Sequence, residues 1–196
     1  MAGRVFVCAH GAGGHKDDRG MTRAAQALEA AGFSVVRFNF PYREKGSGRP
    51  DAMPVLKAAV AEAAARARKE LAPRRLIIGG RSMGGRAASM LAADQIQCDG
   101  LLLLAYPLHP VGKPEQLRDA HLPSLTMPTL CFNGTRDTFC RRDLMEAVLP
   151  RLRPTFSMHW LDGADHSFHV LKSSGRTDAE VMAEVGSATR RWLDES

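Results

Sequence analysis

One serine in this sequence is surrounded by glycines, in the segment GGRSMGG at 79–85. Residues 80–84 match the pattern GxSxG, with Ser82 at its centre. An apolar run precedes the segment and an alanine-rich run follows it, which predicts a turn from a strand into a helix. Glycine fits the outer positions because a side chain there would collide with the neighbouring strand and helix. We therefore expect Ser82 to occupy a sharp turn with positive φ and to present its hydroxyl as a nucleophile.

A serine hydroxyl needs an adjacent base to act as a nucleophile, and the base needs a third group to orient it. After a turn of this kind, the expected order along the chain is serine, acid, histidine. Asp137, in CFNGTRDTFC, lies just past one apolar run, and His166, in LDGADHSFH, lies just past the next. The order predicts that Ser82, Asp137 and His166 act as nucleophile, acid and base.

Other residues compete for the last two roles. The rival acids are Asp143, Asp162 and Asp165, and the rival histidines are His109, His121 and His169. Asp143 falls in an expected helix, and Asp165 adjoins His166 and is expected to shape its loop. His109 and His121 precede the acid in chain order. The alternative for the two favoured residues is a turn aspartate and a loop histidine with purely structural roles.

The segment HGAGG at 10–14 directly follows the first apolar run. A glycine-lined turn at this place can donate a backbone N–H to the oxyanion of an acyl-transfer reaction. We expect the N–H groups of Ala12 and Met83 to be the two donors, and His10 to brace the turn through its ring nitrogens. The segment lacks both GxGxxG and a GK[ST] ending, which argues against a nucleotide site. We expect neither a cofactor nor a metal ion to be required.

Several residues near these turns are candidates for contact with substrate: Gly11, Tyr42, Arg81, Met83, Leu108, Arg136 and Phe139. Arg81 adjoins the serine and Arg136 adjoins the acid, so both could face an anionic part of the substrate. The alternative is that each is a solvated charge or pairs with a nearby carboxylate. For the apolar candidates, the alternative is packing in the core.

Apolar runs alternate with segments of helical periodicity along the whole chain. Expected strands are 4–10, 34–40, 74–80, 100–106, 128–134 and the weaker 155–162. Expected helices are 21–31, 54–71, 84–93, 141–152 and 178–193. Continuously apolar strands suit a parallel sheet that is covered on both faces. The alternation predicts an α/β fold, a three-layer αβα sandwich of about six parallel strands.

Length and composition fit a folded protein of this class. The 196 residues are 44% apolar and 24% charged, and we expect one domain over 1–196. The formal net charge is +6, but the arginines are scattered, so we expect no nucleic-acid partner.

The four cysteines form no CxxC pair and are expected to be reduced, which favours the cytoplasm. We see no targeting segment and no apolar stretch of membrane-spanning length.

Taken together, the segments CAHGAGG, VVRFNFPY, GGRSMGGRAA, FNGTRDTF and GADHSF resemble the α/β-hydrolase superfamily over nearly the whole chain. They are most similar to its small, lidless, dienelactone-hydrolase-like members, in a branch of predicted hydrolases that includes chromatin-complex subunits and testis-expressed proteins. The resemblance implies a nucleophile at Ser82, an acid at Asp137, a base at His166 and oxyanion donors at Ala12 and Met83. Dienelactone hydrolases use a cysteine nucleophile, so their substrate is not implied here.

Two features depart from the larger members of that superfamily. The sequence starts at the strand that precedes the oxyanion turn, and it has only a loop at 107–128 where larger members insert a helical cap. We therefore expect no cap domain and a shallow, open site. The expected activity is hydrolysis of a small ester or thioester, of carboxylesterase or thioesterase type. The alternatives are a hydrolase-like binding or scaffold protein, an acyltransferase and a peptidase, and the oligomeric state is left open.

Overall fold

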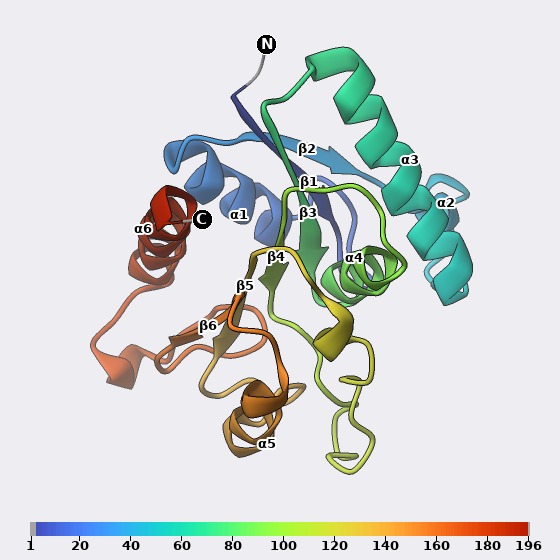
Figure 1. Ribbon diagram of the computed structural model, residues 1–196. Helices are drawn as coiled ribbons and strands as arrows, with labels where there is room; N and C mark the ends of the chain where they lie inside the picture. Colours follow the sequence, from blue (N-terminus) through green and yellow to red (C-terminus); the bar gives the residue numbers. More distant parts are fainter. Residues whose placement is uncertain (1–2, 196) are drawn as a thin grey trace.

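A parallel β-sheet forms the centre of the computed structural model, which describes residues 3–195 (Figure 1). Within those residues its strands are β1 (Arg4–Ala9), β2 (Ser34–Phe38), β3 (Arg75–Arg81), β4 (Gly100–Leu104), β5 (Thr129–Gly134) and β6 (Phe156–Leu161). Their spatial order is β2-β1-β3-β4-β5-β6, and each neighbouring pair is parallel. The expectation of about six parallel strands is confirmed.

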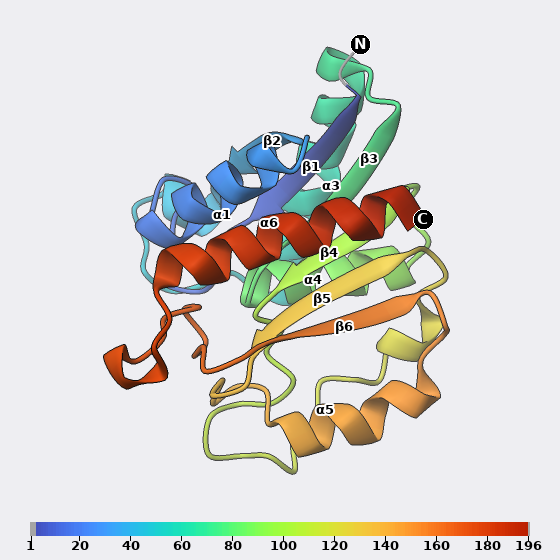
Figure 2. The ribbon, with the colours of Figure 1, turned by 90° about the vertical axis from the view of Figure 1, so that its left-hand side faces the viewer.

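Helices cover both faces of the sheet, which confirms the three-layer arrangement. They are α1 (Arg19–Ala30), α2 (Pro41–Glu44), α3 (Met53–Leu71), α4 (Met83–Ala93), α5 (Arg142–Val148) and α6 (Asp178–Glu195). Helices α1 and α6 lie side by side on one face, and α3 and α4 pack together on the other (Figures 1 and 2). In the part of the chain that the structure describes, no helix is long and apolar enough to cross a membrane.

Each face of the sheet has its own apolar core, because side chains alternate along every strand. On β1, Val5 and Val7 face the α3 and α4 layer, whereas Phe6 and Cys8 face the α1 and α6 layer. Strand β4 is buried along its whole length. This two-sided burial explains why the strands are continuously apolar in the sequence.

The helix boundaries differ from the sequence-based expectation where local chemistry intervenes. Helix α1 begins at Arg19 because Asp18 caps it and accepts a 2.8 Å hydrogen bond from Met21 N. The expected helix 141–152 ends early, since Pro150 cannot donate a helical hydrogen bond and the chain continues as a 3-10 turn over Leu149–Arg151. The loop 107–128 contains a 3-10 turn over Leu122–Ser124.

The strand order places two loops at the point where the chain changes direction across the sheet. The connection after β1 leads outward to β2, whereas the connection after β3 leads the other way, to β4. In open α/β sheets, ligands bind outside the carboxyl ends of the strands at such a switch point. HGAGG follows β1 and Ser82 follows β3, so the topology itself brings these two segments together.

Candidate active site

Ser82 forms the turn between β3 and α4. Its backbone has φ 50° and ψ −117°, which confirms the expected positive φ. A residue other than glycine is strained in this backbone conformation, so the surrounding structure must hold the turn in place. Ser82 N donates a 2.8 Å hydrogen bond to Leu104 O, and Ser82 O accepts a 3.0 Å bond from Arg86 N. The turn is thereby fixed to β4 on one side and to the first turn of α4 on the other.

The glycines around Ser82 allow β1 to pass close to the turn. A Cβ atom on Gly80 would lie 2.2 Å from Ala9 O, and one on Gly84 would lie 2.5 Å from the same oxygen. Those distances are far shorter than any real contact of a Cβ atom. The need for glycine is therefore steric, as expected from the sequence.

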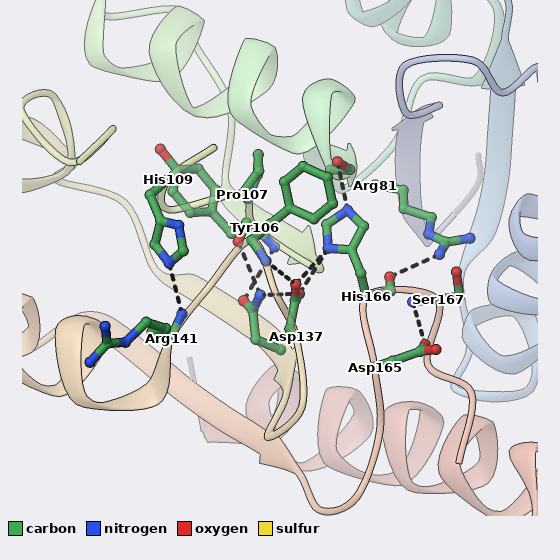
Figure 3. Close-up of polar contacts among 12 residues, drawn as sticks. Arg81, Tyr106, Pro107, His109, Asp137, Arg141, Asp165, His166 and Ser167 are labelled. Atoms are coloured by element: carbon green, nitrogen blue, oxygen red, sulfur yellow. Dashed lines mark hydrogen bonds and ion pairs between the residues drawn. The ribbon is translucent and has the colours of Figure 1, made fainter. Parts of the chain in front are cut away.

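His166 lies between Ser82 and Asp137, and Figure 3 shows its imidazole bonded to the carboxylate of Asp137. Its Nε2 is 2.9 Å from Ser82 Oγ, and its Nδ1 is 2.9 and 2.8 Å from the two carboxylate oxygens of Asp137. An ionised carboxylate can only accept, so Nδ1 carries the proton and Nε2 is left to accept from the serine hydroxyl. The three residues predicted from chain order are thus joined by one line of hydrogen bonds.

Asp137 is held in a fixed orientation and is only 4% exposed. Its Oδ1 accepts a 2.8 Å bond from Phe139 N, and its Oδ2 accepts a 3.0 Å bond from Asn133 Nδ2. Asn133 is itself bonded to the backbone N–H and C=O of Tyr106. Strand β5, which carries Asn133, and the loop after β4 therefore set the position of the carboxylate.

The loop that carries His166 is fixed from two directions. Arg81 Nη2 donates a 3.0 Å bond to the backbone oxygen of His166 (Figure 3). Asp165 Oδ1 accepts bonds from the backbone N–H groups of Ser167 and His169, at 2.7 and 3.0 Å. The expectation that Asp165 shapes this loop is confirmed.

Two backbone N–H groups lie at the wall beside Ser82 without a partner. Within residues 3–195, neither Ala12 N nor Met83 N donates a hydrogen bond to another group. Met83 is the first residue of α4, where the helix leaves its N–H groups free and its dipole is positive. His10 braces the turn as expected, since its Nδ1 lies 2.8 Å from Gly11 O and its Nε2 accepts a 3.1 Å bond from Phe40 N.

A cavity of about 500 Å³ opens beside Ser82 and His166. Its wall also includes Ala12, Asp51, Met53, Leu56, Met83, Arg86, Pro107, Arg118 and Phe139. The ring of Phe139 lies 4.3 Å from the imidazole of His166, measured between centroids. Gly11 lies beside the serine, with its Cβ position 3.4 Å from Ser82 Cβ. Two of the apolar candidates, Met83 and Phe139, therefore line the cavity.

Other candidates for substrate contact lie elsewhere. Tyr42 is 2% exposed and packs against His10 and Phe40, and Leu108 is fully buried. Arg81 lines a separate space of about 290 Å³ behind the histidine loop. Arg136 donates a 3.0 Å bond to Gly163 O. Tyr42 and Arg81, two of the possible substrate contacts, are therefore not among the residues that line the cavity beside Ser82: aromatic packing holds the first, and the His166 loop holds the second.

Arg86 and Arg118 line the cavity, and the sequence reasoning missed both. The available signal for Arg86 was its spacing of four residues from Ser82, which places it one helical turn along α4. Arg118 lies in the irregular loop 107–128, where no periodicity predicts direction. Its approach to the cavity depends on the path of that loop.

The rival acids and histidines have partners of their own. Asp143 pairs with Arg141 on the surface, and His109 Nε2 accepts a 3.1 Å bond from Arg141 N (Figure 3). His169 pairs with Asp178 at 2.9 Å, and His121 Nε2 lies 2.8 Å from Ser89 Oγ. In the described chain none of these groups is bonded to Ser82.

The cysteines do not compete with Ser82 as nucleophiles. All four are free thiols, as expected, and Cys8, Cys131 and Cys140 are buried. Burial raises the pKa of Cys8 to about 12 and that of Cys98 to about 11. A thiol with so high a pKa carries almost no thiolate at neutral pH.

Comparisons with a family model and with solved structures point to the same fold. A family model described as an alpha/beta hydrolase domain matches residues 2–194. An alpha-beta serine hydrolase homologue from Coxiella burnetii is 20% identical, with a TM-score of 0.76 over 97% of this chain and 85% of that chain. A dienelactone hydrolase from Anabaena variabilis is 19% identical, with a TM-score of 0.73 over 99% and 86%. A serine hydrolase without a lid from Xanthomonas campestris is 23% identical, with a TM-score of 0.69 over 96% and 81%. At these identities, the likeness to the three structures is one of fold.

Proposed function

The chain belongs to the α/β-hydrolase domain family, and from that premise we propose that it is a serine hydrolase of carboxylesterase or thioesterase type. Its substrate is a small carboxylic ester or thioester, which it cleaves through an acyl-enzyme intermediate. The nucleophile is Ser82, the base is His166, and Asp137 orients the base. The backbone N–H groups of Ala12 and Met83 form the oxyanion hole.

The first half of the reaction forms the acyl-enzyme. Ser82 Oγ attacks the carbonyl carbon of the substrate while His166 Nε2 takes the hydroxyl proton. The carbonyl oxygen becomes negative and accepts hydrogen bonds from Ala12 N and Met83 N. When the tetrahedral intermediate collapses, the bond to the leaving oxygen or sulfur breaks, and the leaving group takes the proton from His166 Nε2.

The second half releases the acyl group. A water molecule gives a proton to His166 Nε2 and attacks the acyl carbon, and the new oxyanion binds the same two N–H groups. Collapse breaks the ester bond to Ser82, whose oxygen recovers the proton from His166. Throughout, Asp137 keeps the proton on Nδ1 and stabilises the imidazolium, which is why its buried and fully bonded carboxylate matters.

One observation carries this proposal. A serine that the fold holds at φ 50° has its hydroxyl 2.9 Å from an imidazole, and the far nitrogen of that imidazole is bonded to a buried carboxylate. Strain of this kind persists where the surrounding structure enforces it, and it concentrates at functional sites. A strand-to-helix turn that served only for packing would need no such line of hydrogen bonds.

The direct test is labelling with a fluorophosphonate probe, which modifies an activated serine. We expect the parent protein to be labelled and Ser82→Ala to lose the label. The matched control is Ser187→Ala, which removes an exposed hydroxyl from α6 and should leave labelling intact. Labelling that persists in Ser82→Ala would show that Ser82 is not the nucleophile. A parent that is folded by circular dichroism but is not labelled would contradict the proposal and favour a binding role.

A further inference from the structure

Two arginines, Arg86 and Arg118, line the cavity beside Ser82. Arg86 lies on α4 one turn after the serine, and Arg118 comes from the loop that follows β4. The sequence separates them by 31 intervening positions, but in the fold both residues line the same cavity. Nothing in the acyl-transfer steps described above uses either side chain.

Neither arginine forms an ion pair with a carboxylate in residues 3–195. Arg118 Nη1 has only a 3.5 Å bond to Pro107 O, and Arg86 Nε is buried with no hydrogen-bond partner in the described chain. Buried N–H groups of charged side chains are nearly always hydrogen-bonded when their role is structural. Within the described residues, the structure gives Arg86 no such structural role.

The groups around these arginines add little negative charge. Asp51 also lines the cavity, but its Oδ2 accepts a 2.9 Å bond from Tyr42 N. Burial first, and then the charge of Arg86, lower the pKa of His121 to about 4, so this imidazole is neutral at pH 7. Burial and the same charge also lower the pKa of Arg118 below its ordinary value. Among the described residues that line this partly buried cavity, two cations are therefore accompanied by one carboxylate.

We propose that Arg86 and Arg118 bind an anionic group of the substrate, a carboxylate or a phosphate, while Ser82 attacks its ester or thioester bond. This inference rests on the proposed function and names the class of substrate: esters that carry a negative charge away from the reacting carbonyl. Guanidinium groups match the planar oxygen pairs of such anions. An anion in the cavity would also relieve the repulsion between the two cations.

The kinetic test compares esters of the same length that differ only in charge. The 4-nitrophenyl monoesters of adipate and pimelate carry a terminal carboxylate, and the matching terminal amides are neutral. For the parent we expect kcat/KM to be about tenfold or more higher for the acids than for the amides. Arg86→Gln and Arg118→Gln should each lower that ratio toward one, and Arg153→Gln, which removes an exposed arginine from a distant loop, should keep it.

The outcomes separate this inference from the proposed function. If the parent hydrolyses the acids and amides equally well, the anion subsite is wrong and the serine hydrolase stands. A ratio that survives both glutamine variants would likewise overturn the assignment of the two arginines. If the parent hydrolyses neither ester, the proposed function is in doubt, and a binding measurement decides about the subsite.

That measurement is titration calorimetry of the parent with adipate monoamide and, separately, with butyl phosphate. Binding of either anion that is lost in Arg86→Gln supports the subsite, and the tighter of the two ligands identifies carboxylate or phosphate as its preferred group. Increasing salt should weaken the binding, because both partners are charged. Failure of both anions to bind, or equal binding by Arg86→Gln, would overturn the inference even if esterase activity is found.

Discussion

Arg81 and His166 are joined across the site by a 3.0 Å hydrogen bond from the guanidinium of the first to the backbone oxygen of the second. The residue that precedes Ser82 in the chain therefore holds the loop that carries the imidazole. Ser82 follows β3 and His166 follows the end of β6, and these two strands are not neighbours in the sheet, so the bond is a direct link between the two segments.

Replacing Arg81 with methionine should loosen the histidine loop while retaining an unbranched side chain. We expect the rate constant for fluorophosphonate labelling of Ser82 to fall roughly 10- to 100-fold, since a displacement of about 1 Å at a reacting pair has an effect of that size. Arg81→Lys should recover part of the loss, because an ammonium can still donate to the carbonyl. A purely structural arginine would give no such graded response.

The matched control for this variant is Arg136→Met. Arg136 also donates a 3.0 Å bond to a backbone oxygen of the same segment, but at Gly163, and its side chain is exposed. Labelling of Arg136→Met should stay close to that of the parent. If the two methionine variants lose the same amount, general loosening of the segment would explain the result, and the specific role of Arg81 would be wrong.

Gly20 in the first turn of α1 makes room for the same guanidinium. A Cβ atom at this position would lie 2.0 Å from Arg81 Nη1, so Gly20→Ala must displace the arginine side chain. Alanine is the better helix former, and we expect the free energy of unfolding to change by no more than about 1 kcal/mol. Labelling of Ser82 should nevertheless slow, as we also expect for Arg81→Met.

The double variant Gly20→Ala, Arg81→Met then distinguishes a shared cause from two separate ones. Because both changes remove the same hydrogen bond, the labelling rate of the double variant should match that of Arg81→Met alone. If the fold-losses in labelling rate of the two single variants instead multiply in the double variant, Gly20 affects the site independently of the Arg81 hydrogen bond.

Gly84 is expected to tolerate no side chain. Its Cβ position lies 2.5 Å from Ala9 O and 2.6 Å from His10 O, and these are backbone atoms of a central strand and its turn. Gly84→Ala should lower the free energy of unfolding by about 3 kcal/mol, measured by urea denaturation. Gly48→Ala is the control, because no atom lies within 4 Å of its Cβ position. Equal stability of the two variants would refute the steric explanation of the elbow glycines.

Much of the fold and site could be predicted from the sequence because their signals are local. The apolar runs give the strands, and the order of Ser82, Asp137 and His166 along the chain places each one past the end of a different strand. Parallel strands present their carboxyl ends at one edge, so side chains at those ends must converge there. Residues far apart in the sequence could thus be grouped without knowing any distance.

What could not be predicted is the direction of long side chains and the path of loops. Arg81 adjoins Ser82 in sequence, but successive residues of a strand point to opposite faces, and its guanidinium reaches the back of the His166 loop. Arg118 reaches the cavity only because the loop after β4 folds back toward α4. Tyr42 is held in the core because its ring packs against the rings of His10 and Phe40. The spacing of these residues in the sequence does not predict that contact.

His121, which is partly buried, should make the protein less stable in acid. The pKa of His121 falls from an ordinary 6.5 to about 4, because of burial and the charge of Arg86, while in the unfolded chain it returns to its ordinary value. Between those two values the unfolded state binds the extra proton, so stability falls as the pH drops from about 6.5 to 4. The full shift corresponds to about 3 kcal/mol, and solvent at the partly exposed ring reduces our expectation to about 2 kcal/mol.

Urea unfolding at pH 7 and pH 4.5 measures this loss, and His121→Gln should make it smaller. Part of the loss should remain in that variant, because burial also lowers the pKa of His10. His15→Gln, at an exposed site, should leave the loss as it is in the parent. Arg86→Gln removes one cause of the shift, so the His121 ring should titrate at higher pH in that variant by NMR. An unchanged midpoint there would mean that Arg86 is too far from His121 to act on it, and would weaken its placement in the cavity beside Ser82.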